Sequence, residues 1–300
     1  MRPVLIVLAL LLTFNGVYAQ NVQDNLQQMA AENGKGYMKP FVTAFGTNLN
    51  TGLYNTAAVA KPSVLRPVRF GIHFNTMLAF VPEVDRTFDA AFPSDIFESV
   101  PVEAPETIET ATVFGKEGGK FMGERILPNG INLKAVPLIV PQAKVSLPLG
   151  NELMLRFMPP VDMGDFGELN FWGVGLKHSI DQYIPLFPVH LAVQGAYQQF
   201  SAGDIVEVTS WAANAQVSKT LLMLTVYGGI GIEGSSLKAD YEYQPIPGVD
   251  PIPVKFEIDG DNDFRMTAGV RWALLPFIHV NADYSIAKYQ VLNLGFGLSF

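Results

Sequence analysis

Three glycines, Gly229, Gly231 and Gly234, match the G-x-G-x-x-G spacing of a dinucleotide-binding turn. That chemistry needs a strand before the turn and a helix after it, because the helix N-terminus holds the pyrophosphate. The residues that follow, SSLKADYEYQP at 235–245, do not read as a helix. We interpret the three glycines as strand residues that face a crowded interior, and we expect no bound cofactor.

Alternating carboxylates at Asp259, Asp261 and Asp263 resemble the start of a calcium-binding loop. An EF-hand loop also has Gly at its sixth position and Glu at its twelfth. Those positions hold Phe264 and Val270. We therefore interpret the segment as the tip of a loop and expect no resident metal, with an opportunistic surface calcium site as the alternative.

The chain contains four histidines, and none is paired at a metal-ligand spacing such as H-x₃-H: His73, His178, His190 and His279. Most of them lie on polar faces of expected strands, which favours hydrogen bonding in an interior. The alternative is a Ser–His lipid-modifying enzyme, which needs a serine and an orienting polar group beside one histidine. No G-x-S-x-G motif is present, although outer-membrane lipases of this kind do not require it. Hydrogen bonding in an interior is the interpretation that we adopt, and we expect a protein that is not an enzyme.

Isolated polar residues at every second position of several segments are the remaining candidates. The polar face of a soluble sheet is rich in Lys and Glu, whereas these residues are of unlike kinds. We expect them to face a lumen, and the candidates are Arg156, His190, Gln194, Arg265, Arg271, His279 and Asp283. With Lys144, the charged ones form either a salt-bridge network that fills a narrow barrel or a constriction that determines selectivity.

The segments that carry these residues alternate in polarity. In RPVRFGIHFNTMLAF, Phe70, Ile72 and Phe74 share one face, and His73 and Asn75 share the other. Hydrophobic residues make up 49% of the chain and charged residues only 16%, with a mean hydropathy of +0.22. No apolar run after the first nineteen residues is long enough for a membrane-crossing helix, so alternation must account for the apolar composition.

Apolar residues on one face and isolated polar residues on the other are typical of strands that cross a bilayer. We predict an all-β protein, a transmembrane antiparallel β-barrel of about 10–14 strands with a short N-terminal helical segment. The expected helix covers residues 21–34 within a plug-like segment at 20–64, and the barrel covers 65–300. Long loops are expected at 81–130, which is acidic, and at 235–263, and tight turns near Pro148–Gly150, Lys219–Thr220 and Leu275–Pro276.

The N-terminal residues 1–19, MRPVLIVLALLLTFNGVYA, have a basic start, a short apolar run and small residues before Ala19. These features predict a cleavable signal peptide and export to the cell outer membrane. The chain has no Cys, so neither lipidation nor disulfides are expected. A net charge of −8 argues against nucleic acid as a partner.

The C-terminal residues 294–300, LGFGLSF, place a large hydrophobe at every second position: Leu294, Phe296, Leu298 and Phe300. This pattern resembles the C-terminal assembly signal of bacterial outer-membrane barrels. The resemblance implies that the barrel-assembly machinery is a partner and that outer-membrane lipid surrounds the protein.

Four further segments resemble an uncharacterised outer-membrane β-barrel family of diderm bacteria: LNTGLYNTAAVAKP, TVFGKEGG, PQAKVSLPLGNELMLRFMPP and WGVGLKHSIDQYIPLFPVHLAVQGAYQ. A helix ahead of a barrel is also similar to the layout of the FadL-like long-chain fatty-acid transporters. That similarity implies a channel for a small hydrophobic ligand. The alternatives are a structural or surface-interaction barrel with a closed lumen, and more remotely an outer-membrane lipid-modifying enzyme.

Overall fold

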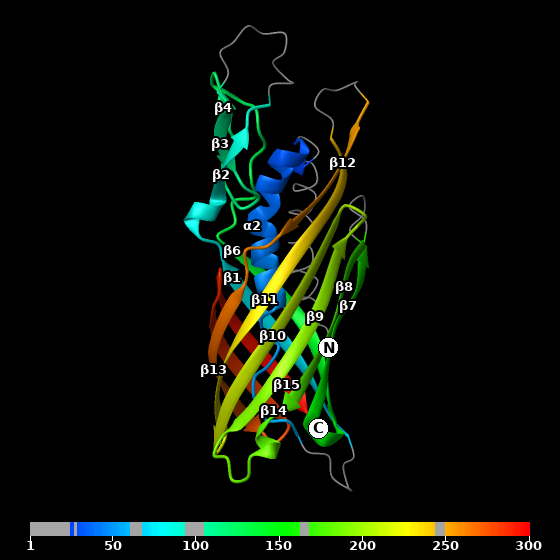
Figure 1. Ribbon diagram of the computed structural model, residues 1–300, viewed down its shortest axis with the longest axis vertical. Helices are drawn as coiled ribbons and strands as arrows, with labels where there is room; N and C mark the ends of the chain where they lie inside the picture. The colour runs from blue at the N-terminus through cyan, green and yellow to red at the C-terminus, as the bar shows by residue number, and fades with distance from the viewer. Residues whose placement is uncertain (1–24, 27–28, 61–67, 94–104, 163–167, 244–249) are drawn as a thin grey trace.

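The computed structural model describes residues 25–26, 29–60, 68–93, 105–162, 168–243 and 250–300. It is a tall cylinder of tilted strands with one helix inside its upper part (Figure 1). The predicted signal peptide at 1–19 lies outside the described residues. No helix among the described residues is long and apolar enough to cross a membrane.

The helical elements, apart from a short piece at Asn25–Leu26, are α2 Ala31–Leu49, η1 Glu83–Arg86, η3 Pro148–Gly150 and η5 Asp181–Tyr183. The first nine strands are β1 Arg69–Phe80, β2 Thr87–Ala91, β3 Thr107–Ala111, β4 Lys120–Phe121, β5 Glu124–Arg125, β6 Ala135–Leu147, β7 Asn151–Asp162, β8 Glu168–Ser179 and β9 His190–Ala202. The remaining strands are β10 Val206–Leu221, β11 Leu224–Tyr243, β12 Ile252–Asp259, β13 Phe264–Leu275, β14 Ile278–Ile286 and β15 Gln290–Ser299.

The main sheet closes into a ring. Its order is β10-β9-β8-β7-β6-β1-β15-β14-β13-β11, and a further antiparallel pairing joins β10 to β11. Ten strands therefore form a closed wall with no free edge, and β12 pairs only with the far end of β11. The prediction of an antiparallel barrel of about 10–14 strands with an N-terminal helix is confirmed.

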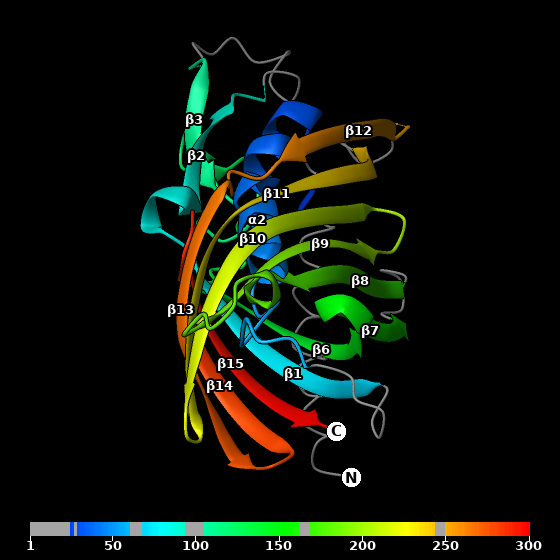
Figure 2. The ribbon, with the colours of Figure 1, turned by 60° about the horizontal axis from the view of Figure 1, so that its bottom comes forward.

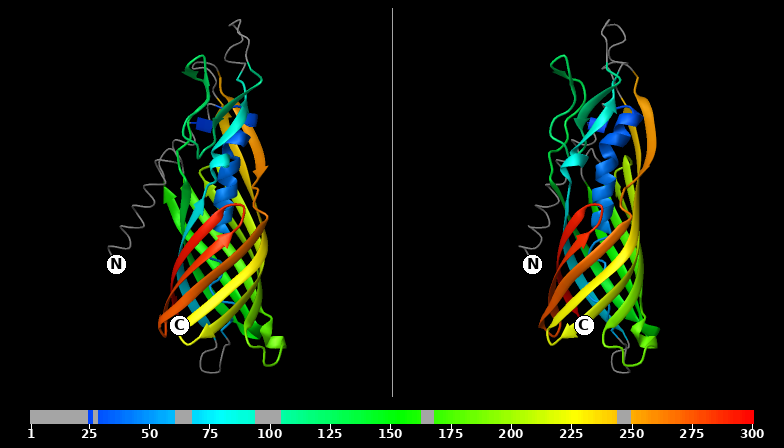
Figure 3. Two further views of the ribbon diagram at one scale, coloured as in Figure 1. Left: turned by 90° about the vertical axis from the view of Figure 1, so that its left-hand side faces the viewer. Right: turned by 60° about the vertical axis from the view of Figure 1, so that its left-hand side comes forward.

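The two ends of the barrel differ, and we name them by their connections. The turn end carries η3, η5 and the short turns at Leu222–Met223 and Pro276–Phe277, and the C-terminus lies there (Figure 3). The loop end carries the β1–β6 connection and the β11–β13 connection (Figure 1). The expected turn at Lys219–Thr220 was misplaced by three residues, because β10 continues to Leu221.

The helix lies inside the ring, where strands surround it (Figure 2). It covers 31–49 and so overlaps the expected range 21–34 at only a few residues. Gly34, Gly36, Pro40 and Gly46 are poor helix formers, which is why the sequence pattern missed it. The lumen favours them nevertheless, because a Cβ on Gly46 would stand 2.3 Å from the Ser235 side chain.

The apolar core lies in the loop half of the lumen. Tyr37, Met38, Val42 and Leu49 of α2 are at most 1% exposed and pack against inward side chains of the wall. Thirteen of the nineteen helical residues are buried, as expected of a helix that is surrounded on all sides. Burial of apolar surface therefore seats the helix, while its own propensity contributes little.

The expected long loops contain more structure than predicted. β11 extends as far as Tyr243 and pairs with β12, so most of the range 235–263 is a hairpin and not a loop. The acidic range 81–130 contains the β2–β3 hairpin, which rests on α2. The Asn33 side chain donates to the Ala91 carbonyl and accepts from its N–H, each at 2.9 Å.

Candidate functional site

The lumen is occupied by the chain's own N-terminal part. We call residues 31–60, which are α2 and the extended stretch after it, the plug. The plug enters the ring at the loop end and runs toward the turn end (Figures 1 and 2). Polar side chains of the wall meet it below the apolar core, and this layer is the candidate site.

Arg156 on β7 holds the end of α2. Its guanidinium donates to the Leu49 carbonyl at 2.6 Å and to the Thr51 carbonyl at 2.7 Å. It also donates to the side chains of Gln142 and Gln198 at 2.7 and 2.8 Å. Carbonyls at a helix C-terminus lack partners within the helix, and a cation there also complements the helix dipole. Arg156 is 1% exposed and is a predicted lumen residue that lies in the lumen.

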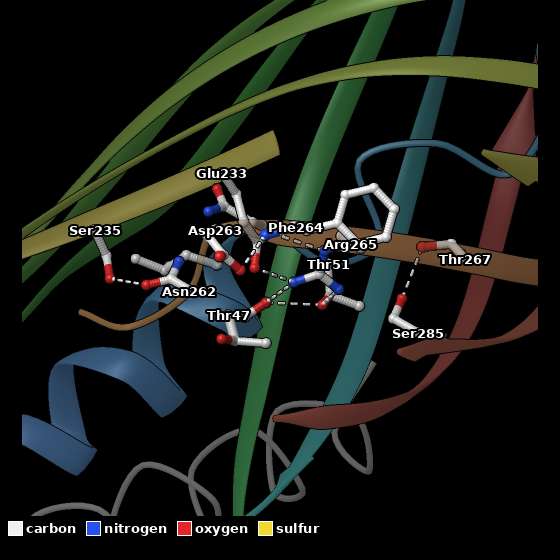
Figure 4. Close-up of polar contacts among 12 residues, drawn as sticks. Thr47, Thr51, Glu233, Ser235, Asn262, Asp263, Phe264, Arg265, Thr267 and Ser285 are labelled. Carbon is white, nitrogen blue, oxygen red and sulfur yellow. Dashed lines mark hydrogen bonds and ion pairs between the residues drawn. The ribbon is translucent and has the colours of Figure 1, made fainter. Parts of the chain in front are cut away.

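Arg265 on β13 makes the equivalent contact from the other side (Figure 4). It donates to the Thr47 carbonyl at 2.6 Å and to the Thr51 hydroxyl at 2.7 Å. Glu233 on β11 forms a salt bridge with it at 2.8 Å. Two arginines from opposite parts of the wall thus bind the same turn of the plug. The carboxylate of Glu233 holds one of them, Arg265, in position.

Asn55 of the plug lies against a pair of histidines. Its side-chain nitrogen is 3.5 Å from His73 Nδ1 and 3.5 Å from His279 Nε2, and the two rings are bridged at 3.2 Å. The space for these rings exists because β15 carries Gly297, where a Cβ would stand 2.2 Å from His279. The small residues of LGFGLSF therefore face the lumen, and its large hydrophobes face outward.

Below this level the plug is held by Thr56. Its hydroxyl is 3.1 Å from that of Ser218 on β10, and its carbonyl accepts from Lys177 at 3.2 Å. Lys177 also forms a buried salt bridge with Glu152 at 2.8 Å. Plug and wall therefore stay joined by hydrogen bonds down to the turn half of the barrel.

The remaining predicted lumen residues are placed as follows. Gln194 accepts from Gln216 at 2.7 Å and is buried. Asp283 accepts from Tyr227 and Asn293, each at 2.7 Å. Arg271 faces inward and its Nε is buried without a hydrogen-bond partner among the described residues.

His190 is the exception, because it lies at the turn-end rim and its side chain is 47% exposed. Its Nδ1 is 3.0 Å from Asp181, which also accepts from the Ser179 hydroxyl at 2.8 Å. In a catalytic triad the histidine lies between the serine and the carboxylate. Here the carboxylate of Asp181 lies between Ser179 and His190, so the order of a triad is not present. Burial of Asp181 raises its pKa, but the hydrogen bonds from Ser179, His190 and the Leu191 N–H outweigh this, so the pKa lies below its ordinary value.

The cavity beside the middle of the plug is small. It has a volume of about 20 Å³ and lies between residues 50–54 of the plug and the wall at Glu233, Arg265 and Asp283. That volume holds about one water molecule, whereas ligand pockets have roughly 300–1,000 Å³. A wider hollow of about 660 Å³ is bordered by the outward side chains of Leu176, Val193 and Ile230. The wider hollow therefore belongs to the outer surface and not to the lumen.

The outer surface of the wall is a belt of exposed hydrophobic side chains. Many of these side chains are aromatic, and two sets of them are in contact or on neighbouring strands. Trp172, Tyr197 and Trp211 lie together on β8, β9 and β10, with the first two rings 5.8 Å apart. Phe70 and Phe300 stack at 5.1 Å at the turn end. An apolar band flanked by aromatic girdles is the surface that a lipid bilayer requires.

A comparison with protein families matches residues 1–300 to one described as a family of unknown function, DUF6588. The chain belongs to this family. Its membership confirms the predicted link to an uncharacterised family, whereas the similarity to fatty-acid transporters stays a prediction. No curated protein matches the chain.

Several solved structures are similar to this DUF6588 chain at low identity. The N-terminal β-barrel domain of Pseudomonas aeruginosa OprF shares 12% identity, with a TM-score of 0.24, over 50% of this chain and 94% of that one. Ail of Yersinia pestis shares 10%, with a TM-score of 0.27, over 78% and 99%. The Escherichia coli outer membrane protease OmpT shares 9%, with a TM-score of 0.30, over 78% and 96%. TM-scores this low do not establish a common arrangement, so the membrane assignment rests on the outer surface.

Sequence reasoning missed several residues that hold the plug. Glu152, Lys177 and Glu233 all face inward, and Glu152 lies four residues from Arg156 on the same face of β7, whereas no polar lumen residue was predicted on β8 or β11. Their alternation with outward hydrophobes was the available signal. Asn55 and Thr56 carried no such signal, because the plug below α2 is extended without being a strand.

Proposed function

We propose that this protein is an integral outer-membrane barrel with a closed lumen, and that its ordered loop end is a surface for interaction with a partner. The belt of exposed hydrophobic side chains supports the membrane placement. Short turns at one end and long connections at the other support an orientation with the loop end outside the cell. No catalytic activity is part of this proposal.

The observation that carries the proposal is the plug itself. Its helix is seated by apolar packing, and buried hydrogen bonds from Arg156 and Arg265 hold the last turn of the helix and Thr51 just after it. Removing one partner of such a bond leaves a buried polar group unsatisfied, which costs about 1–3 kcal/mol per group. Several such contacts keep the plug in place, and a plugged barrel has no route for a solute.

The loop end is well suited to binding because it is acidic and its described part is structured. In the sequence, residues 81–130 contain ten Asp or Glu and four Lys or Arg. Arg86 connects this region internally, because it donates to the Phe114 carbonyl at 3.1 Å and to Asn132 at 2.6 Å. A partner with a basic surface, or a divalent cation, fits this charge.

A FadL-like channel for small hydrophobic compounds is the second candidate. The observation that favours it is the change in the plug at Leu49. Above that residue the plug packs into the large apolar core, whereas below it the plug has only a small apolar cluster around Leu53 and Tyr54 together with exchangeable hydrogen bonds. In this candidate the lower plug moves aside to open a path along the wall.

A disulfide between the lower plug and the wall separates the two candidates. The hydroxyls of Thr56 and Ser218 are 3.1 Å apart, which suits a T56C/S218C pair, and the chain has no other Cys. Conductance in planar bilayers is compared for the oxidised and reduced double variant, with Thr56→Ser/Ser218→Thr as the matched control. Lipids that co-purify are analysed by mass spectrometry.

The closed-lumen proposal expects silent bilayers in both redox states and no enriched hydrophobic compound. Conductance or ligand uptake that appears on reduction and disappears on oxidation contradicts it and supports the channel. Failure of the disulfide to form in a folded barrel contradicts the placement of Thr56 beside Ser218, on which the closed-lumen proposal depends.

A further inference from the structure

Two cations in the turn half of the lumen have no hydrogen-bond or ion-pair partner among the residues that the structure describes. Lys144 on β6 is 7% exposed and makes no hydrogen bond or ion pair with any residue that the structure describes. Arg271 on β13 faces inward as well, and its Nε is buried without a partner among the same residues. The two residues approach the axis from strands separated by β1, β15 and β14 in the ring.

The groups around them do not balance their charge. Lys177 lies in the same electrostatic neighbourhood, and Glu152 is the acidic group there that acts on both Lys144 and Arg271. Glu152 is already paired with Lys177 at 2.8 Å. Three cations thus share one carboxylate, while the Arg265–Glu233 pair farther up is balanced.

Neutral hydrogen-bonding groups lie beside this excess of positive charge. His73 and His279 are within electrostatic range of both Lys144 and Arg271. Each histidine has a ring nitrogen that can donate to a ligand, depending on its tautomer. Asp283 is not a competing partner of Arg271, because its carboxylate accepts from Tyr227 and Asn293.

A buried ammonium or guanidinium without a partner is costly, because the interior does not replace the water that each one loses. A bound anion removes that cost. The planar fork of a guanidinium favours carboxylate and phosphate oxygens, and an ammonium is a compact point charge that also binds phosphate.

We propose that the lumen between Lys144 and Arg271 is a binding site for a small oxyanion, phosphate or a simple carboxylate, that enters from the turn end. The exposure of the described residues favours entry from that side. Arg271 is inward-facing and yet only partly buried, and Thr56 and Ala58 of the plug are partly exposed at the same end. The plug closes the other side, so the anion is held in the turn half.

The test uses the full chain refolded in a neutral detergent with chloride as the only other anion. Inorganic phosphate, acetate and a short-chain phosphatidic acid are titrated separately. Binding is measured by the shift in melting temperature and, for phosphate, by ³¹P line broadening. The variants are Lys144→Met and Arg271→Met, and the matched control is Lys219→Met, an exposed lysine on β10 near the turn end.

We expect phosphate or acetate to raise the melting temperature of the natural chain and of the control, because a ligand that binds only the folded state stabilises it. Either variant weakens binding by about tenfold or more, since each removes one of two charge-assisted contacts. Without a ligand, Lys144→Met raises the melting temperature, because it removes a buried unpaired charge.

Three outcomes overturn the proposal. One is the absence of any shift or broadening with phosphate and acetate in the natural chain. Another is equal binding in the natural chain, Lys144→Met and Arg271→Met. A third is binding of phosphatidic acid without binding of either free anion, which shows that the two cations bind a lipid headgroup and not a free oxyanion. If one variant does not fold, the other and the natural chain still decide the matter.

Discussion

Single residues in the lumen act as connectors between plug and wall. Arg156 is the clearest of them, because its four hydrogen bonds end on two plug carbonyls and two wall side chains. An arginine can do this because its donors are arranged as a fixed planar fork and its charge is retained when it is buried. The same geometry explains why lysine is not equivalent at this position.

We predict that Arg156→Gln lowers the free energy of unfolding by about 3–5 kcal/mol, because two buried carbonyls of the plug lose a charged donor. Urea unfolding in detergent, followed by near-ultraviolet circular dichroism, measures the change. Arg69→Gln is the control, since Arg69 is exposed at the start of β1. Equal stability of the two variants contradicts the role given to Arg156.

Gly297 and Gly195 provide a matched pair on the two faces of the wall. A Cβ on Gly297 meets His279 at 2.2 Å and His73 at 2.6 Å, whereas a Cβ on Gly195 has nothing within 4 Å. Gly297→Ala is expected to lower stability by about 1–3 kcal/mol through overpacking, and Gly195→Ala to change it little. The folded fraction on cold semi-denaturing gels and the urea midpoint measure both.

At the scale of elements, the strands could be predicted and the plug could not. Phe70, Ile72 and Phe74 alternate with His73 and Asn75, and the structure places the two sets on opposite faces, as expected. Successive side chains of a strand point to opposite faces of the sheet, so the alternation in the sequence shows which side of the wall each residue faces. Arg156 and Arg265 could be identified as inward for the same reason.

The helix was predicted at 21–34 but lies at 31–49. The predicted range was wrong because contacts with distant parts of the chain, and not the local sequence, determine where this helix forms. Gly36 and Pro40 disfavour a helix in isolation, and packing inside a closed wall overrides that preference. The partners of Arg156 could not be predicted either, because the Leu49 and Thr51 carbonyls are backbone atoms, which every residue type has. Long-range contacts of this kind produce no periodic pattern in the sequence.

The η5 turn should respond to acid. The pKa of Asp181 is below its ordinary value, so its contribution to stability is complete above the unfolded value of about 4 and is lost as the pH falls through the folded value. We expect the amide hydrogens of the segment 180–190 to be less protected, relative to their intrinsic exchange rates, below about pH 4 than at pH 6. Asp181→Asn should remove most of this dependence, and a turn that is equally protected at both pH values contradicts the argument.

For the whole molecule, the proposed membrane placement puts the two ends of the barrel on opposite sides of the outer membrane. Met122 is 79% exposed in the long β1–β6 connection, and Leu222 is 100% exposed in a tight turn at the opposite end. Because the chain has no Cys, one introduced Cys reports its own location. We predict that Met122→Cys reacts with a membrane-impermeant maleimide on intact cells and that Leu222→Cys reacts only after the outer membrane is opened. The reverse pattern contradicts the proposed orientation.

The continuous ring of ten strands also limits the ways in which the protein can assemble. Once β1 and β15 have paired along their whole length, the wall has no lateral opening, and only the two ends of the cylinder remain as entrances. The helix then either rests on the unfinished sheet before the first and last strands meet or enters along the axis through the loop end. In both cases the pairing that closes the ring joins two strands more than two hundred residues apart in the chain, so the enclosed plug depends on the most distant contact in the wall.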